Sequence, residues 1–145
     1  MRRIEKPLSG NIVIGDIGPN TGWQRALEGI KCVIHLAARA HVMREDSPDA
    51  LAEYRIVNVA GTEKLARDAA AQGVRRLVFL SSIKVNGERT PDRPLTENDA
   101  PEPEDAYGIS KWEAEQSLWK IAAETGLEVV VLRAPLVYGP GVKGN

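Results

Sequence analysis

The sequence of 145 residues is poor in cysteine and histidine, the residue types that most often bind metal ions or form disulfide bonds. Cys32 is its only cysteine, which excludes an intramolecular disulfide bond and a zinc site built on cysteines. His35 and His41 have no partner spacing that favours a metal site. The 19 lysine and arginine residues nearly balance the 20 aspartate and glutamate residues, so neither a nucleic-acid surface nor a polybasic membrane-binding surface is indicated.

Long hydrophobic runs are also missing. None approaches the roughly 18 apolar residues of a membrane span, and the N-terminus lacks the apolar core of a signal peptide. We therefore expect a cytoplasmic protein.

Short apolar runs recur along the chain and predict strands. They lie at 11–15, 31–36, 76–81 and 128–133. Because these runs are almost continuously apolar rather than alternating, we expect the strands to be covered on both faces.

Segments typical of helices separate the predicted strands and span 21–29, 47–73 and 106–126. Thr21 and Gln24 suit a capping box, and Ser47 suits an N-cap before Pro48. A glycine ends each of the three helices. Alternation of strand and helix predicts βαβ units and therefore an α/β fold with a parallel sheet.

A tyrosine and a lysine stand four residues apart at the beginning of the third predicted helix. Tyr107 and Lys111 therefore project from one helix face. An ammonium group near a phenol lowers its pKa, which would suit the phenol to exchange a proton with an alcohol or a ketone. The same spacing also occurs where an exposed cation merely lies near an aromatic ring.

Other polar residues follow the predicted strands, where parallel sheets bind ligands. Ser81 and Ser82 end the third run, and they could bind a substrate oxygen or only satisfy backbone groups. Asp16 follows the first run and could accept a hydrogen bond from an amino group or cap a turn. The irregular segment 86–105 is rich in proline and acidic residues, and it is either a solvated excursion or a loop over a ligand cleft.

Six segments in order resemble the extended short-chain dehydrogenase/reductase family, in its nucleotide-sugar epimerase, dehydratase and reductase branch. The resemblance runs from about Ile12 to Gly141. The segments are Gly15-Asp16-Ile17, His35-Leu36-Ala37-Ala38, Asn58-Val59-Ala60-Gly61-Thr62, Ser81-Ser82, Tyr107-Gly108-Ile109-Ser110-Lys111 and the stretch from Arg133 to Gly141.

The resemblance implies a partial Rossmann-like, doubly wound parallel sheet in three α/β/α layers. It implies a nicotinamide cofactor, NAD or NADP with NAD favoured, and a nucleotide-diphosphate sugar as substrate. By resemblance, Tyr107 is the catalytic acid and base, Lys111 lowers its pKa and holds the nicotinamide ribose, and Ser82 binds the reacting sugar oxygen. The implied cofactor-binding residues are Asp16, Ile17, Leu36, Ala37, Ala38, Asn58, Ser81, Lys111, Pro135 and Val137. Asp16 would meet the adenine, and Asn58 could instead bond to nearby backbone.

The sequence departs from the family in ways that bear on the reaction. Ile83 and Lys84 stand where sugar 4,6-dehydratases carry an Asp-Glu pair, so dehydration is not expected. Asn86 replaces the tyrosine of a usual Val-Tyr-Gly motif, and Leu136 lies near the position of an asparagine that contacts the sugar diphosphate in many epimerases. These differences favour a sugar 4-epimerase or 4-ketoreductase with an altered pocket.

The family's Gly-rich phosphate-binding turn is not found in residues 1–10, and its substrate domain is not found after the last predicted strand. We therefore expect residues 1–145 to be the central part of a dinucleotide-binding domain, without the first βαβ unit. Two functions stay open: an oxidoreductase that is impaired in this chain, or a non-catalytic Rossmann-like module or self-associating fragment that binds no dinucleotide tightly.

The resemblance also implies a homodimer through the helices at 48–72 and 107–125. Trp112 and Trp119 stand two helical turns apart on one stripe, which suits either core packing against the sheet or an intermolecular helix bundle. Cys32, inside an apolar run, is expected to be a small buried hydrophobe.

Overall fold

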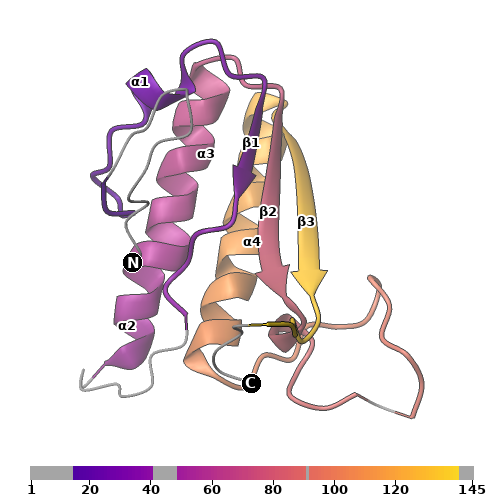
Figure 1. Ribbon diagram of the computed structural model, residues 1–145. Coiled ribbons are helices and arrows are strands. Elements are labelled where there is room, and N and C mark those ends of the chain that lie inside the picture. The colour runs from indigo at the N-terminus through magenta and orange to yellow at the C-terminus, as the bar shows by residue number, and fades with distance from the viewer. Residues whose placement is uncertain (1–14, 41–48, 91, 141–145) are drawn as a thin grey trace.

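The centre of the computed structural model, which describes residues 15–40, 49–90 and 92–140, is a parallel sheet of three strands (Figure 1). The strands are β1 (Cys32–His35), β2 (Arg76–Ser82) and β3 (Glu128–Ala134), in the spatial order β1-β2-β3. Three of the predicted strands are thereby confirmed. The fourth, at 11–15, lies outside the described residues except for Gly15, which is not in a strand.

Helical segments connect the strands as the alternation predicts. They are α1 (Gln24–Leu27), α2 (Ala50–Tyr54), η1 (Arg55–Ala60), α3 (Gly61–Ala71), η2 (Ile83–Val85) and α4 (Ala106–Thr125). The segments α2, η1 and α3 follow one another without a break, and η1 is a π-helical turn in the middle.

The N-terminal caps of α1 and α2 differ from the predicted ones. Thr21 does not cap α1, because its hydroxyl accepts from the Gly18 amide at 3.0 Å and donates to the Asp16 carbonyl at 2.6 Å. Asp49 caps α2 by accepting from the Ala52 amide at 2.9 Å, while the predicted cap at Ser47 lies outside the described residues.

The glycine stop of the third predicted helix is confirmed. Gly126 follows α4 with a φ of 76°, a left-handed conformation that glycine adopts without steric cost.

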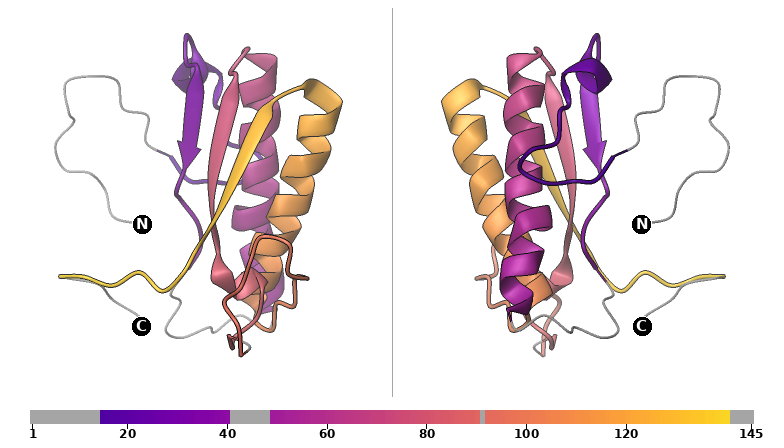
Figure 2. Two further views of the ribbon diagram at one scale, coloured as in Figure 1. Left: turned by 90° about the vertical axis from the view of Figure 1, so that its right-hand side faces the viewer. Right: turned by 90° about the vertical axis from the view of Figure 1, so that its left-hand side faces the viewer.

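One face of the sheet carries the hydrophobic core. Leu77 and Phe79 of β2 are fully buried against α3 and α4, which Figure 2 shows on the same side of the sheet. Leu65 of α3 and Leu118 of α4 complete the centre of this core. Only every second residue of β2 is buried, because successive side chains of a strand point to opposite faces of the sheet.

The opposite face of the sheet is open in the part of the chain that the structure describes. Ile34 is 65% exposed and Leu132 is 50% exposed, so the prediction of strands covered on both faces is wrong for these residues. Cys32 belongs to the same strand as Ile34 and is exposed rather than buried. None of the described helices is long and apolar enough to cross a membrane.

Candidate active site

The candidate active site lies at the carboxyl ends of the three strands. In Figure 1 their arrowheads point to the end of the molecule where α4 begins and where the loop 86–105 emerges. Parallel α/β sheets bind ligands at this end because the strand ends and the beginnings of helices leave a crevice there.

Ser82 and Tyr107 meet at this end. Ser82 is the last residue of β2, and its side chain lies close enough to Tyr107, in the first turn of α4, to lower the pKa of the phenol. The Ser82 hydroxyl also accepts from the Lys84 amide at 3.3 Å, which fixes it at the beginning of η2. The structure therefore brings together the two residues that the sequence suggests for the reacting oxygen.

The Tyr107 phenol has a raised pKa, not the lowered one that the sequence predicts. Burial is the largest cause, and the Asp105 carboxylate and the Tyr54 phenol also raise the pKa. The hydrogen bond from Ser82 and the charge of Lys84 oppose this effect without cancelling it. The phenol therefore keeps its proton at neutral pH.

Lys111 lies on the same helix face but turns its ammonium toward the sheet. The side chain is 2% exposed, and Nζ lies 3.9 Å from the centre of the Phe79 ring. Burial lowers its pKa to about 8, while the charge of Glu115 raises it in part. Within the described residues this ammonium has a cation–π contact but no hydrogen-bond acceptor, so its donors remain available to ribose hydroxyls.

His35 is a buried neighbour of the same cluster. Its Nε2 is hydrogen-bonded to the Thr62 hydroxyl at 2.9 Å, and its ring lies 5.6 Å from that of Phe79. Burial first, and then the charge of Lys111, lower its pKa to about 4. A neutral imidazole at this position keeps a second positive charge away from Lys111.

The low pKa of His35 predicts that acid destabilises the protein. The unfolded chain binds a proton at His35 near pH 6.5, whereas the folded chain does so only near 4, so stability is complete above 6.5 and falls below it. Between pH 7.5 and 5 we expect the free energy of unfolding to fall by about 2 kcal/mol from this group. Urea denaturation at both pH values measures this change. The His35→Gln variant should lose most of the pH dependence, and an equally steep loss in that variant would contradict the assignment.

Asn58 holds the segment after β1 against α4. Its Oδ1 accepts from the Arg39 amide at 2.8 Å, and its Nδ2 donates to the Arg39 carbonyl at 3.1 Å and to the Ser110 hydroxyl at 2.9 Å. Ser110 in turn donates to the Tyr107 carbonyl at 2.8 Å. Asn58 lies in the π-helical turn η1, and its partners lie 19 and 52 residues away rather than in the nearby backbone that the alternative from sequence suggested. Any contribution to cofactor binding would pass through the segment that it holds.

The remaining predicted cofactor residues lie around this centre rather than within it. Ala37 and Ala38 follow β1 and are half-buried, while Leu36 beside them is 63% exposed. Pro135 and Val137 are exposed on the segment that leaves β3, which runs away from the sheet in Figure 2.

Asp16 and Ile17 lie on the segment before α1. A Cβ atom built on Gly61 would come within 2.7 Å of the Ile17 side chain, so this segment packs closely against the beginning of α3. Asp16 itself is exposed. The structure does not place these two residues in the Ser82–Tyr107 cluster.

An ion pair next to η2 supports the beginning of α4. The Lys84 ammonium lies 2.7 Å from carboxylate oxygens of both Asp105 and Glu88. Asp105 is the N-cap of α4, and its other oxygen accepts from the Gly108 amide at 2.6 Å. Lys84 therefore helps to fix the helix turn that carries Tyr107.

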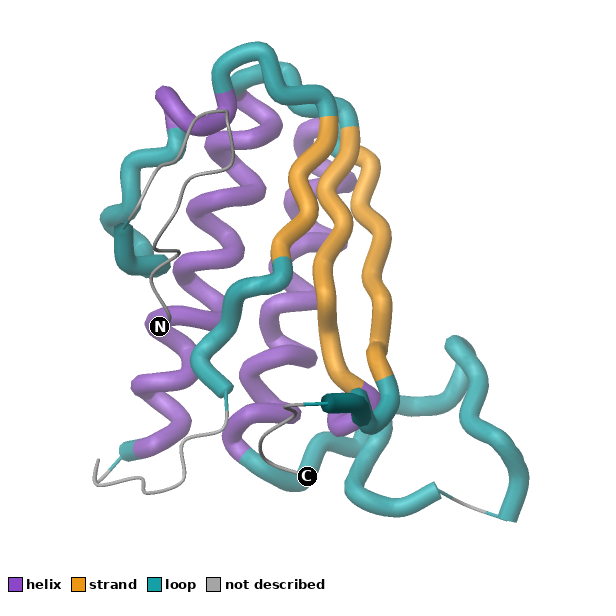
Figure 3. Tube along the Cα trace, viewed as in Figure 1, coloured by secondary structure: helices purple, strands orange, loops and turns teal. Residues whose placement is uncertain are grey.

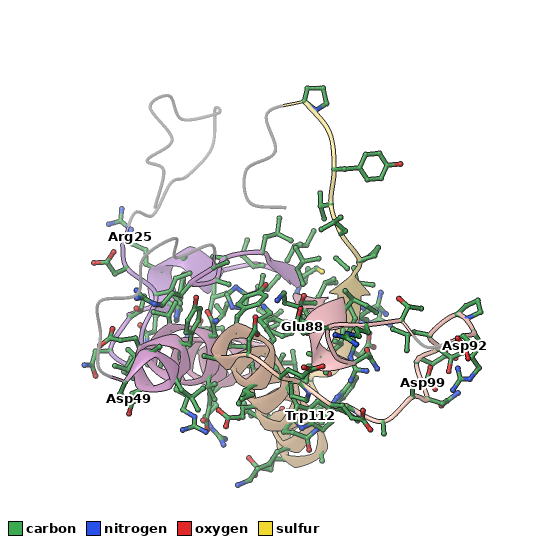
Figure 4. The ribbon with its side chains drawn as sticks, turned by 90° about the horizontal axis from the view of Figure 1, so that it is seen from below. Arg25, Asp49, Glu88, Asp92, Asp99 and Trp112 are labelled. Atoms are coloured by element: carbon green, nitrogen blue, oxygen red, sulfur yellow. The ribbon has the colours of Figure 1, made fainter. Side chains whose placement is uncertain are left out.

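The loop 86–105 is anchored at its base and projects from the sheet (Figure 3). The Glu102 amide donates to the Val85 carbonyl at 2.9 Å and closes the base of the loop. In Figure 4, Glu88 lies near the helices, whereas Asp92 and Asp99 lie at the far end. Of the two alternatives from sequence, the far end fits a solvated excursion and the base adjoins the site.

Further polar residues, which the sequence did not reveal, lie behind the Ser82–Tyr107 cluster. Ser81 does not face the cluster, because its hydroxyl donates to the buried carboxylate of Glu115 at 2.5 Å. The spacing of Glu115, one helical turn after Lys111, was the available signal. Trp119, which could have been a core residue, is 45% exposed.

The fold is Rossmann-like, of the kind that binds dinucleotides. It is defined by the parallel sheet, its connecting helices and the residues at the strand ends. The family model for the NAD dependent epimerase/dehydratase family matches residues 2–145. The chain belongs to this family, and its resemblance to short-chain dehydrogenases/reductases is confirmed.

Named relatives agree with this assignment. The chain is 48% identical over 133 residues to a UDP-glucose 4-epimerase of Vibrio cholerae. This alignment covers 91% of this chain and 40% of the relative. It is 35% identical over 137 residues to an N-acetyl-alpha-D-glucosaminyl-diphospho-ditrans,octacis-undecaprenol 4-epimerase of Escherichia coli O157:H7. This second alignment covers 91% of this chain and 39% of the relative. The chain thus spans about two fifths of the length of these relatives.

Solved structures share the fold. MoeE5 in complex with UDP-glucose and NAD has a TM-score of 0.76 and 34% identity, over 90% of this chain and 43% of that one. DesIV, the dTDP-glucose 4,6-dehydratase of Streptomyces venezuelae with NAD bound, has a TM-score of 0.77 and 32% identity, over 87% of this chain and 38% of that one.

Proposed function

We propose that the protein is a nucleotide-sugar 4-epimerase or 4-ketoreductase that uses a nicotinamide cofactor, with Tyr107 as the acid and base. The observation that carries this proposal is the meeting of Ser82, the last residue of β2, with Tyr107 in the first turn of α4 at the carboxyl end of the sheet. A hydroxyl and a phenol held together can bind one sugar oxygen and move its proton. The 4-epimerases among the relatives support the choice of C4.

In the proposed reaction, Tyr107 and Ser82 handle the oxygen at C4. Oxidation of the sugar requires Tyr107 in its phenolate form, which takes the hydroxyl proton as hydride leaves C4, and Ser82 holds the resulting ketone oxygen. When the ketone is reduced, Tyr107 returns the proton to the oxygen. The raised pKa of Tyr107 favours its protonated form, which is the form needed for this second step.

The cofactor would accept and return the hydride. Lys111 is the residue best placed to hold its ribose, because the buried ammonium has no acceptor among the described residues. The half-buried Ala37 and Ala38 would let the cofactor approach the backbone after β1. NAD is favoured because MoeE5 and DesIV bind NAD in their structures, although a neighbour from Pseudomonas aeruginosa is complexed with NADPH.

Two measurements test the proposal. Calorimetric titration of the purified protein with NAD and NADP, in both redox states, decides whether it binds a dinucleotide. Incubation with UDP-glucose and NAD, followed by NMR analysis of the configuration at C4, tests epimerisation. Incubation with a nucleotide 4-keto sugar and NADH or NADPH, with the same NMR analysis, tests reduction. Dinucleotide binding with turnover supports the proposal. No detectable binding would support the alternative, a non-catalytic Rossmann-like module.

The homodimer expected from the resemblance stays a proposal. A groove of about 260 Å³ lies between the outer faces of η1 and α4 and is lined by Ile56, Val59 and Ala60 together with charged residues. Its apolar floor suits packing against a second copy of these helices. A monomer in sedimentation equilibrium at tens of micromolar would refute the dimer.

A further inference from the structure

A buried carboxylate on α4 lies behind the proposed active site. Glu115 is 1% exposed and stands eight residues after Tyr107 and four after Lys111. A charged carboxylate at this depth is costly unless it has hydrogen-bond donors and a positive partner. Two residues of the sheet supply them.

Glu115 joins the ends of two neighbouring strands. The Ser81 hydroxyl of β2 donates to its Oε1 at 2.5 Å, and a terminal guanidinium nitrogen of Arg133 in β3 donates to its Oε2 at 2.8 Å. Ser81 and Arg133 are direct partners in the strand register. The carboxylate therefore fixes both strands at one level, one residue before Ser82.

Arg133 continues this network to the loop 86–105. Its other terminal nitrogen donates to Oδ1 of Asn86 at 3.2 Å, and Nδ2 of Asn86 donates to the Asp99 carbonyl at 3.3 Å. The Arg133 guanidinium also lies 5.6 Å from the centre of the Trp112 ring. The buried ion pair is thereby linked to a residue far along the loop.

We infer that Glu115, paired with Arg133, is a positioning residue of the active site, which holds Ser82 in place against Tyr107 and anchors the loop 86–105 beside it. The role of this positioning in catalysis rests on the proposed function. Glu115 would act through Ser81 and the strand end, without touching the substrate itself.

The Tyr107 phenol reports on this positioning, because the hydrogen bond from Ser82 lowers its pKa. The chain has three tyrosines, so ¹³Cζ-tyrosine labelling gives a simple NMR spectrum, and the Tyr107→Phe variant identifies the Tyr107 signal. Titration of that signal requires neither cofactor nor sugar. It therefore remains decisive even if the proposed reaction is not observed.

Two variants and one control make the experiment. Glu115→Gln removes the charge and keeps the shape, but it leaves Arg133 partly buried without its carboxylate partner and risks unfolding. The double variant Glu115→Leu/Arg133→Met removes both charges together, a change that folded proteins often tolerate. Glu124→Gln is the matched control, because Glu124 lies on the same helix in an exposed ion pair with Arg67.

We expect the Tyr107 pKa to rise by about 0.5 unit or more in the double variant, because Ser82 is no longer held against the phenol. Glu115→Gln should shift it in the same direction where it folds, and the control should match the wild-type protein. A folded double variant with an unchanged Tyr107 pKa would overturn the inference. Unfolding of both Glu115 variants beside a folded control would also overturn it, because the pair would then serve only stability.

Discussion

Replacing Tyr107 by phenylalanine is expected to lower turnover by about 10²- to 10⁴-fold, the usual contribution of a positioned acid or base. The variant removes the phenol hydroxyl that is proposed to exchange a proton with the sugar oxygen and keeps the ring. Cofactor affinity should change little, because the proposed cofactor contacts come from Lys111 and the segment after β1. Steady-state kinetics and calorimetric titration of the same preparations separate the two effects.

The matched control for this variant is Tyr138→Phe. Tyr138 is 86% exposed, so the same chemical change at that position should leave both turnover and cofactor binding unaltered. A Tyr107→Phe protein with normal turnover would remove Tyr107 from the mechanism. Equal losses in both variants would point to a general effect of the lost hydroxyls.

The position of the candidate site could be predicted from the sequence. Apolar runs that end in Ser81 and Ser82 predict a strand with polar residues at its carboxyl end, and a glycine stop at Gly126 defines the helix that carries Tyr107. These features depend on residues close together in the sequence. The parallel arrangement then brings the strand ends and the beginning of α4 to one edge of the sheet.

The electrostatics of the site could not be predicted in this way. Helical spacing places Tyr107 and Lys111 on one face, but it does not fix where a four-carbon side chain turns. In the structure the Lys111 ammonium lies over the Phe79 ring, and burial is the largest cause that raises the Tyr107 pKa. Both effects come from β2 and α4 packing together, which depends on residues distant in the sequence.

Contacts over long sequence separations also explain the supporting residues that the sequence did not reveal. Glu115 and Arg133 are 18 residues apart, and Ser81 and Glu115 are 34 apart. The π-helical turn around Asn58 has no local signal either, because its side chain bonds to Arg39 and Ser110 across the fold. Nor does the sequence predict that the second face of the sheet is open among the described residues, because apolar runs do not distinguish a covered face from an open one.

Replacing Gly108 by alanine is expected to damage both stability and turnover. A Cβ atom at Gly108 would lie 2.8 Å from the Lys84 carbonyl oxygen and 3.1 Å from Oδ1 of Asp105. Alanine normally favours a helix over glycine by about 1 kcal/mol. Here the nearer neighbour is backbone that cannot rotate away, so the steric conflict outweighs that gain and costs about 1–3 kcal/mol.

The loss of turnover follows from the place of Gly108 directly after Tyr107. To relieve the contact, the first turn of α4 must move away from η2, and the phenol moves with it relative to Ser82. A displacement of about 1 Å at a reacting group can cost about 100-fold in rate. We therefore expect a loss of that size even at temperatures where the variant is fully folded.

Urea denaturation and steady-state kinetics on Gly108→Ala and Gly18→Ala measure these effects. Gly18 is the control because a Cβ atom there would meet no other atom within 4 Å, and its φ is not in the left-handed region. A Gly108→Ala protein as stable and as active as the control would show that α4 can retreat from Lys84 without cost. The close approach of the helix to η2 would then have no part in placing Tyr107.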